Sequence, residues 1–159
     1  MAQSIGPALR KHWRRLSTLP AGRPLFSRLL GRFVPYTGQL GATVAVLEPG
    51  HCVVRLKERR KLRNHLHSVH AMAVANLGEM ATGLALMNSL PDNTRGILRH
   101  FEINYLKKAR GLLTAECGCD IPENNQQREV AVNCEIRDSA GDVVSHVTAH
   151  WLLGPEQDS

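Results

Sequence analysis

The sequence lacks an apolar run long enough to cross a bilayer, because its longest apolar segment, residues 71–87, contains Asn76, Glu79 and two glycines. It also lacks a CxxC pair, and no secretory signal precedes its four cysteines, so we expect reduced, buried thiols in a cytoplasmic protein. Internal repeats and low-complexity tracts are missing as well. With 159 residues, 43% of them hydrophobic, the chain is expected to form one globular domain.

Acidic residues are missing from the first 33 positions, which contain seven Lys or Arg. The net charge of +6 therefore belongs to an N-terminal arm, residues 1–35, while the remainder is nearly balanced. A nucleic-acid-binding domain would carry its positive patch on the folded body, so no nucleic-acid partner is expected. Two amphipathic patterns, at 4–17 and 25–33, predict helices that pack on the domain and turn their arginines to water. A membrane-surface role or an organelle transit peptide is the alternative for such an arm.

Charge is also scarce between Asn64 and Pro91, where Glu79 is the one Asp, Glu, Lys or Arg. Apolar residues recur at three- and four-residue spacing, which predicts a long helix that is buried on nearly all sides. A carboxylate inside such a helix is costly unless it is paired, protonated or used in chemistry. Glu79 is therefore the first candidate for a functional residue.

The rest of the domain, residues 36–155, has the pattern of strands. A hairpin is predicted at 40–48 and 51–58 around the Pro49-Gly50 turn, and four strand-like segments follow the helix, at 95–107, 111–121, 127–137 and 143–153. Successive hairpins imply antiparallel pairing, so the fold class is α+β, with an antiparallel sheet wrapped around one long helix. The edge strands of such a sheet need covering, which favours a homodimer or a dimer of dimers.

Three polar residues carry a closer resemblance. Asn64, then His70 six residues later at the helix start, then Glu79 nine residues after that, resemble the site pattern of PaaI-type thioesterases of the hotdog superfamily. VAVLEPGHCVVRL resembles the first hairpin of that family, and INYLKKARGLLTAEC resembles its third-strand segment. The chain is thus similar to an uncharacterised branch of this superfamily whose helix acid is Glu. The resemblance implies a hotdog fold and acyl-CoA thioester hydrolysis.

The resemblance also implies roles for the site residues. Glu79 is the base or nucleophile, and its pKa should be raised by apolar surroundings. The helix start at His70 and Ala71 provides N–H groups for an oxyanion, although Ala71 stands where the family has glycine. Asn64 would orient water or the carbonyl, with His65 beside it as a substrate-binding candidate. Nine residues of helix span about 13 Å, so the acid is expected to work with the helix start of another subunit.

The remaining expectations concern ligands. Coenzyme A enters as part of the substrate, so no separate cofactor is expected, and its phosphates need cations, for which Arg63, Lys107 and Arg110 are candidates. The histidines at 65, 67 and 70 have no Cys partner and no strong ligand pattern, so no metal is expected. Two alternatives stay open: a non-catalytic acyl-CoA-binding protein, and a hotdog hydratase or dehydratase using His65 and Glu79, which are fourteen residues apart.

Overall fold

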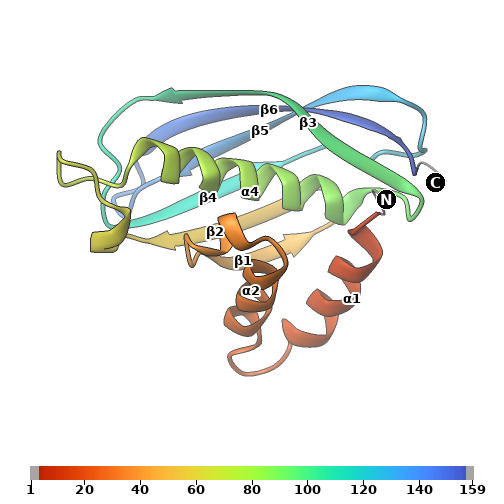
Figure 1. The fold of residues 1–159 in the computed structure, drawn as a ribbon, viewed down its shortest axis with the longest axis horizontal. Coiled ribbons are helices and arrows are strands. Elements are labelled where there is room, and N and C mark those ends of the chain that lie inside the picture. The colour runs from red at the N-terminus through yellow and green to blue at the C-terminus, as the bar shows by residue number, and fades with distance from the viewer. Residues whose placement is uncertain (1–3, 157–159) are drawn as a thin grey trace.

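The computed structural model describes residues 4–156, and one long helix lies in the curve of a single sheet (Figure 1). The elements before the central helix are α1 (Gly6–Leu16), α2 (Gly22–Phe33), α3 (Pro35–Gly38), β1 (Thr43–Glu48), β2 (His51–Lys57) and the 3-10 turn η1 (Arg60–Leu62). The central helix α4 (Ala71–Ser89) is followed by β3 (Thr94–Tyr105), β4 (Leu112–Gly118), β5 (Arg128–Arg137) and β6 (Val143–Pro155). The predicted hairpin, long helix and four later strands are all present. Among residues 4–156, no helix is long and apolar enough to span a membrane.

The sheet has six strands in the order β1-β2-β4-β5-β6-β3, and every neighbouring pair is antiparallel. The expectation of successive hairpins is wrong at one point, because β3 pairs with β6 and not with β4. The connection after β3 passes the start of α4, where the Val69 N–H donates to the Ala109 carbonyl (2.8 Å), and then enters β4 beside β2. This crossover leaves β3 at one edge of the sheet.

The core lies between α4 and the sheet. As the sequence predicted, α4 is buried on most of its surface, and Leu77, Ala81 and Ala85 have no exposed surface. Gly78 allows the closest approach of helix and sheet, because a Cβ there would lie 2.7 Å from Val147 Cγ2. A fully buried leucine contributes about 1.5–3 kcal/mol through removal of apolar surface from water. Close packing against the sheet therefore fixes the position of α4.

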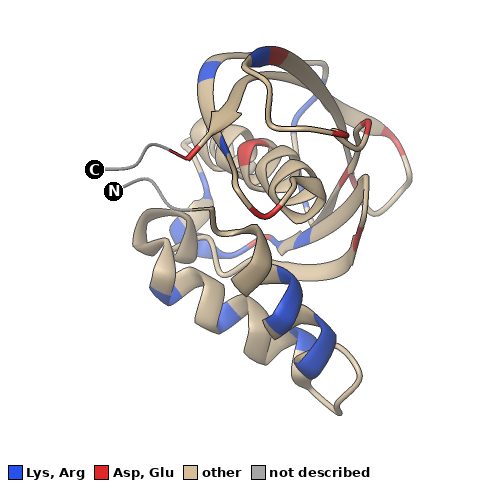
Figure 2. Cartoon of the chain, turned by 90° about the vertical axis from the view of Figure 1, so that its right-hand side faces the viewer, with Lys and Arg blue, Asp and Glu red and all other residues tan. Residues whose placement is uncertain are grey.

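The arm packs on the domain. Leu9 of α1 and Phe26 of α2 are buried in the common core, and the rings of Trp13 and Phe26 meet edge to face with centroids 5.0 Å apart. Most of its Lys and Arg residues are exposed, and Figure 2 shows their positions along the two helices.

Arg10 differs from the other cations of the arm. Its Nη1 donates to the carbonyls of Asn88 (3.1 Å) and Leu90 (3.0 Å) at the end of α4, and its Nη2 pairs with Asp92. A cation at a helix C-terminus satisfies free carbonyls and interacts favourably with the helix dipole. Arg10 thus fastens α1 to the far end of α4.

The four cysteines are free thiols, as expected. Cys52, Cys117 and Cys134 are aligned across β2, β4 and β5 and are buried, whereas Cys119 is only half-buried. Burial raises the pKa of Cys134 to about 12 and also raises the pKa of Cys52 and Cys117. These thiols stay protonated at neutral pH, so they are packing residues and not nucleophiles.

Candidate active site

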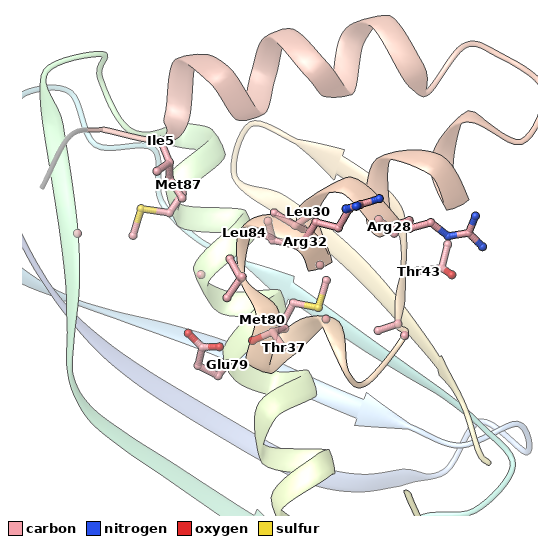
Figure 3. A pocket seen from close by; sticks show the side chains of 18 of the residues that line it. Ile5, Arg28, Leu30, Arg32, Thr37, Thr43, Glu79, Met80, Leu84 and Met87 are labelled. Atoms are coloured by element: carbon pink, nitrogen blue, oxygen red, sulfur yellow. The ribbon is translucent and has the colours of Figure 1, made fainter. Parts of the chain in front are cut away.

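Glu79 lies at the middle of α4 beside a cavity of about 740 Å³ (Figure 3). The floor of the cavity is one face of α4, formed by Glu79, Met80, Gly83, Leu84 and Met87. The start of β3 and Trp151 of β6 form one side, and α2 and α3 form the other. A volume of this size is typical of small-molecule sites. The carboxylate that the sequence singled out therefore borders the space in which a ligand would fit.

The carboxyl group of Glu79 is half-buried, and within residues 4–156 it makes no ion pair and no side-chain hydrogen bond. Burial raises its pKa above the ordinary value of 4.5, because the charged form loses hydration without gaining a partner. A carboxylate with a raised pKa is a stronger base near neutral pH. Glu79 is thus neither a paired structural charge nor an ordinary surface acid.

The start of α4 presents free N–H groups. His70 is the N-cap, and its Nδ1 accepts a hydrogen bond from the Met72 N–H (3.1 Å). Within the described residues the Ala71 N–H has no acceptor, and Ala71 is exposed. The Tyr105 hydroxyl donates to the Ala71 carbonyl (2.9 Å) and so ties the end of β3 to this turn. A free N–H at the positive end of a helix is a suitable donor for a developing oxyanion.

Asn64 closes the loop that leads into the helix. Its Oδ1 accepts from the N–H groups of Leu66 (2.9 Å) and Ser68 (3.2 Å) and from the Ser68 hydroxyl (3.2 Å). The amide NH₂ of Asn64 is therefore the group left for a substrate or a water molecule. His65 is exposed in the same loop. The structure brings Asn64, His65, His70 and Ala71 together at one end of α4.

Glu79 is not part of that cluster. Eight residues separate it from Ala71, which on a helix is about 12 Å. Within one chain the predicted acid and the predicted oxyanion donors are thus at separate places on α4.

The three predicted phosphate-binding cations lie near the helix start, but their pairing differs. Arg63 pairs with Glu58 (2.5 Å), and Arg110 reaches the Leu66 carbonyl at 3.5 Å. Lys107 is held by two carboxylates of the β5–β6 turn, Asp138 (2.9 Å) and Asp142 (2.6 Å). Both carboxylates raise the pKa of Lys107. Of the three cations, Lys107 is the one paired with two carboxylates among the described residues.

Sequence reasoning missed Trp151 and Thr94 as cavity residues. A Cβ on Gly83 would lie 3.2 Å from Trp151 Cη2 and 3.8 Å from Glu79 Oε1, so the indole and the carboxylate approach the same point. Trp151 Nε1 and Thr94 Oγ1 are buried and have no hydrogen-bond partner within residues 4–156. Alternation along 143–153 already places Trp151 on the inward face, but only the packing of β6 on α4 at Gly83 places it beside Glu79.

The arm residues that line the cavity were missed as well. The amphipathic patterns predicted which helix faces are buried, but carried no signal for which of those faces borders the cavity. In the part of the chain that the structure describes, no group of three His, Cys, Asp or Glu side chains is arranged to hold a metal ion. The chemistry available here is that of a carboxylate, backbone N–H groups and amide or imidazole side chains.

Comparison with known proteins gives a family and a fold. A family model described as "Domain of unknown function (DUF4442)" matches residues 22–153. A structural-genomics protein is 25% identical with a TM-score of 0.81, over 94% of this chain and 99% of its own. A protein of unknown function from Pseudomonas aeruginosa, described as a probable thioesterase, is 22% identical with a TM-score of 0.75, over 87% and 97%.

A thioesterase family protein from Silicibacter pomeroyi is 17% identical, with a TM-score of 0.70 over 82% of this chain and 96% of its own. The comparison with curated proteins found no match. The chain therefore has the α+β hotdog fold that the sequence predicted, as found in thioesterase-family proteins.

Proposed function

We propose that this chain, which belongs to the family described as Domain of unknown function (DUF4442), hydrolyses acyl-CoA thioesters to a free acid and coenzyme A. One observation carries the proposal: Glu79, on a buried helix, has no charged partner within residues 4–156, and it borders a cavity of about 740 Å³. The fold shared with thioesterase-family proteins supports the reaction class.

In the reaction that we propose, Glu79 is the general base. Its carboxylate takes a proton from water while the water oxygen attacks the thioester carbon, and the carbonyl electron pair moves to oxygen. The Ala71 N–H and the helix dipole of α4 stabilise that oxyanion, a contribution of about 3 kcal/mol per donor in comparable sites. Collapse of the intermediate breaks the C–S bond, and the CoA thiolate recovers the proton from Glu79. In a variant of the first step, the Glu79 carboxylate attacks the thioester carbon directly, and water then hydrolyses the resulting anhydride.

The donors for the oxyanion come from a second copy of the chain in this proposal. The two edges of the sheet differ, because the edge N–H of Val44 in β1 donates to Ser27 of α2 (2.9 Å) whereas β3 has an open side. Large apolar side chains are exposed along β3 and at the start of α4: Ile97, Tyr105, Leu106, Leu66 and Met72, the last with 60% of its surface. Pairing of two β3 edges would cover these residues and would place α4 of one copy beside α4 of the other.

Coenzyme A would then approach from the helix start. Arg63 and Arg110 flank the loop that contains Asn64 and His65, so they are the candidates for its phosphates. Lys107 contributes less, because Asp138 and Asp142 already neutralise it.

The test is release of CoA, followed with a thiol reagent, from aryl-, short- and long-chain acyl-CoA. Glu79→Gln should lower kcat/KM by about 10²- to 10⁴-fold, the usual contribution of a general base. The matched control is Glu129→Gln, because Glu129 is an exposed glutamate on β5 that does not line the cavity. If wild type releases CoA no faster than Glu79→Gln does, the proposal that Glu79 catalyses hydrolysis is contradicted.

The same samples separate the two alternatives. If wild type and Glu79→Gln release no CoA but bind acyl-CoA equally well, the chain is a binding module. Hydration of crotonyl-CoA that is lost in His65→Ala would instead indicate the hydratase, although His65 lies exposed at the other end of the site from Glu79.

A further inference from the structure

The arm forms one wall of the cavity that Glu79 borders. Residues of α2, of α3 and of the link between them line it: Pro24, Ser27, Arg28, Leu30, Gly31, Arg32, Val34, Thr37 and Gly38. On the opposite side lie Trp151 and the start of β3. Without α2 and α3, the cavity would be an open groove on α4. The arm therefore encloses the candidate site in addition to packing on the domain.

This wall is fastened at several points. The Ser27 hydroxyl accepts from the Val44 N–H (2.9 Å), and the Thr37 hydroxyl donates to Asn76 Oδ1 on α4 (3.1 Å). Gly31 and Gly38 bring α2 and α3 into backbone contact, because a Cβ on Gly31 would lie 2.9 Å from Gly38 Cα. Together with the Arg10 contacts to the end of α4, these bonds make α2 and α3 a fixed wall.

The floor of the cavity is mainly apolar, and four arginines also line the cavity: Arg28, Arg32, Arg59 and Arg95. Leu30, Met80, Leu84 and Met87 face it, and Glu79 is the one acidic residue that lines it. The floor runs from Glu79 to Met87, eight residues or about 12 Å of helix. With C–C bonds of about 1.5 Å, an extended chain of roughly eight to ten carbons matches that length. The side chains of Arg28 and Arg32 extend away from Glu79 (Figure 3).

We propose that this cavity binds an unbranched aliphatic acyl chain and that α2 and α3 set the chain length, with the reacting carbon at the Glu79 end. The inference rests on the proposed function, because it takes the thioester to be the group beside Glu79. An apolar floor of Met80, Leu84 and Met87 that leads away from the Glu79 carboxylate fits an alkyl chain better than a compact aromatic acid.

The test compares two neighbouring leucines of α2. Leu30 lines the cavity, whereas Leu29 faces away from it and is exposed. With acyl-CoA esters from butyryl to palmitoyl, Leu30→Trp should lower kcat/KM for the longest good substrates by about tenfold or more, and leave butyryl-CoA nearly unchanged. Leu29→Trp should leave the whole profile unchanged. An unchanged profile in a folded Leu30→Trp protein would overturn the inference.

Two further measurements keep the outcomes distinct. Leu30→Ala enlarges the cavity and should shift the preference to longer chains, so the inference can be tested even if Leu30→Trp does not fold. Binding of non-hydrolysable acyl-CoA thioethers is measured by calorimetry in parallel. Length-dependent binding that Leu30 controls, without hydrolysis, supports the cavity and contradicts the enzyme. Hydrolysis that depends neither on chain length nor on Leu30 supports the enzyme and contradicts the acyl-chain cavity.

The outer face of α2 carries a second, independent inference. Leu25, Leu29 and Phe33 follow at four-residue spacing and are exposed, Phe33 by 69%, and Tyr36 continues the row with 70%. Arg28 and Arg32 stand beside this row. Within the described residues, neither arginine has a carboxylate partner. The face thus joins exposed apolar side chains to unpaired cations.

We infer that this face binds an anionic lipid surface. Apolar side chains interleaved with arginine are typical of helices that lie in the interfacial region of a bilayer. Each cation near such a surface adds about 1 kcal/mol. The first acidic residue of the chain is Glu48, so the arm offers anions no competing charge of its own.

Vesicle sedimentation of the full chain tests this inference. Wild type should bind phosphatidylcholine vesicles that contain phosphatidylserine, should bind pure phosphatidylcholine vesicles much less, and should be released by salt. Phe33→Ser and the pair Arg28→Gln with Arg32→Gln should each reduce the partition coefficient by about fivefold or more. Ile121→Ser, at an exposed residue of the β4–β5 loop, is the control and should change nothing. No binding by wild type would overturn the inference, and Phe33→Ser dissociating an oligomer without vesicle binding would assign the face to a second copy.

Discussion

The middle and the beginning of α4 differ in how completely one chain encloses them. Around Glu79 one chain supplies two walls of the cavity: α2 and α3 on one side, and Trp151 and the start of β3 on the other. At the helix start, Asn64, His70 and Ala71 are at the surface, with the open edge of β3 beside them. One chain therefore holds a carboxylate beside a cavity but about 12 Å from the N–H groups of the helix start, and it holds those N–H groups without a carboxylate in reach. The comparison suggests that the binding cavity belongs to one subunit and the reaction chemistry to two.

The largest expected effect breaks this comparison directly. Glu79→Gln and Asn64→Ala should each lower kcat/KM by about 10²-fold or more, because each removes one half of the site. Refolding the two variants together forms mixed dimers in which one of two sites has both residues intact, so about a quarter of wild-type activity should return. Activity is measured as CoA release, and each variant refolded alone is the control. No recovery in the mixture would show that both residues act within one chain.

Next in size is a contrast between the two sides of α4. Leu77 is buried against the sheet, so Leu77→Ala should lower the free energy of unfolding by about 3–5 kcal/mol. Leu84 also packs in the core but borders the cavity, which already reduces its contacts, so Leu84→Ala should cost about 2 kcal/mol. Urea unfolding of both variants measures the difference. Equal losses would indicate that the cavity side is as tightly packed as the sheet side.

A smaller effect concerns the cavity wall. Arg10→Met keeps the aliphatic stem but leaves the Asn88 and Leu90 carbonyls without a donor, and should cost about 1–2 kcal/mol. Arg14→Met, at an exposed arginine of the same helix, is the matched control and should change stability by no more than about 0.5 kcal/mol. Thermal unfolding measures both. Similar shifts in the two variants would mean that Arg10 does not hold the arm to α4.

The smallest expected effect is a pH dependence. Because the folded state raises the pKa of Glu79, the folded chain holds this proton more tightly than the unfolded chain does. The contribution of Glu79 to the free energy of unfolding is therefore most favourable below the ordinary glutamate pKa of 4.5. That contribution falls as the pH rises through 4.5 towards the raised pKa. Glu79→Gln should match wild type near pH 4 and be the more stable of the two at pH 7. Urea unfolding at the two pH values measures this, and a constant difference would contradict it.

The periodicity of apolar residues predicted the helices and strands well, because the burial of one face of an element sets the spacing of apolar residues within that element. The hairpin, the helix and the four later strands follow from which residues must leave water, and the lone charge of Glu79 is visible in one dimension. The order of strands was not predictable in the same way, because the connection after β3 crosses to β2 instead of returning as a hairpin. That crossover depends on contacts such as Val69 with Ala109, which are forty residues apart in the chain.

The candidate site shows the same limit. Asn64, His70 and Glu79 stand out by type and spacing along the chain. Leu30 and Trp151 do not stand out as functional residue types, and they meet at one cavity only because α2 packs on β1 and α3 while β6 packs on α4.

The sequence alone determined which residues are buried, that one carboxylate lies within a buried helix, and that the arm carries the excess positive charge, because each of these depends on residue type and local period. Tertiary structure decided that the carboxylate has no charged partner among residues 4–156, that it borders a cavity, and that α2 and α3 form a wall of that cavity. These properties arise from contacts between segments far apart in the chain, and the periods of individual helices and strands carry no record of them.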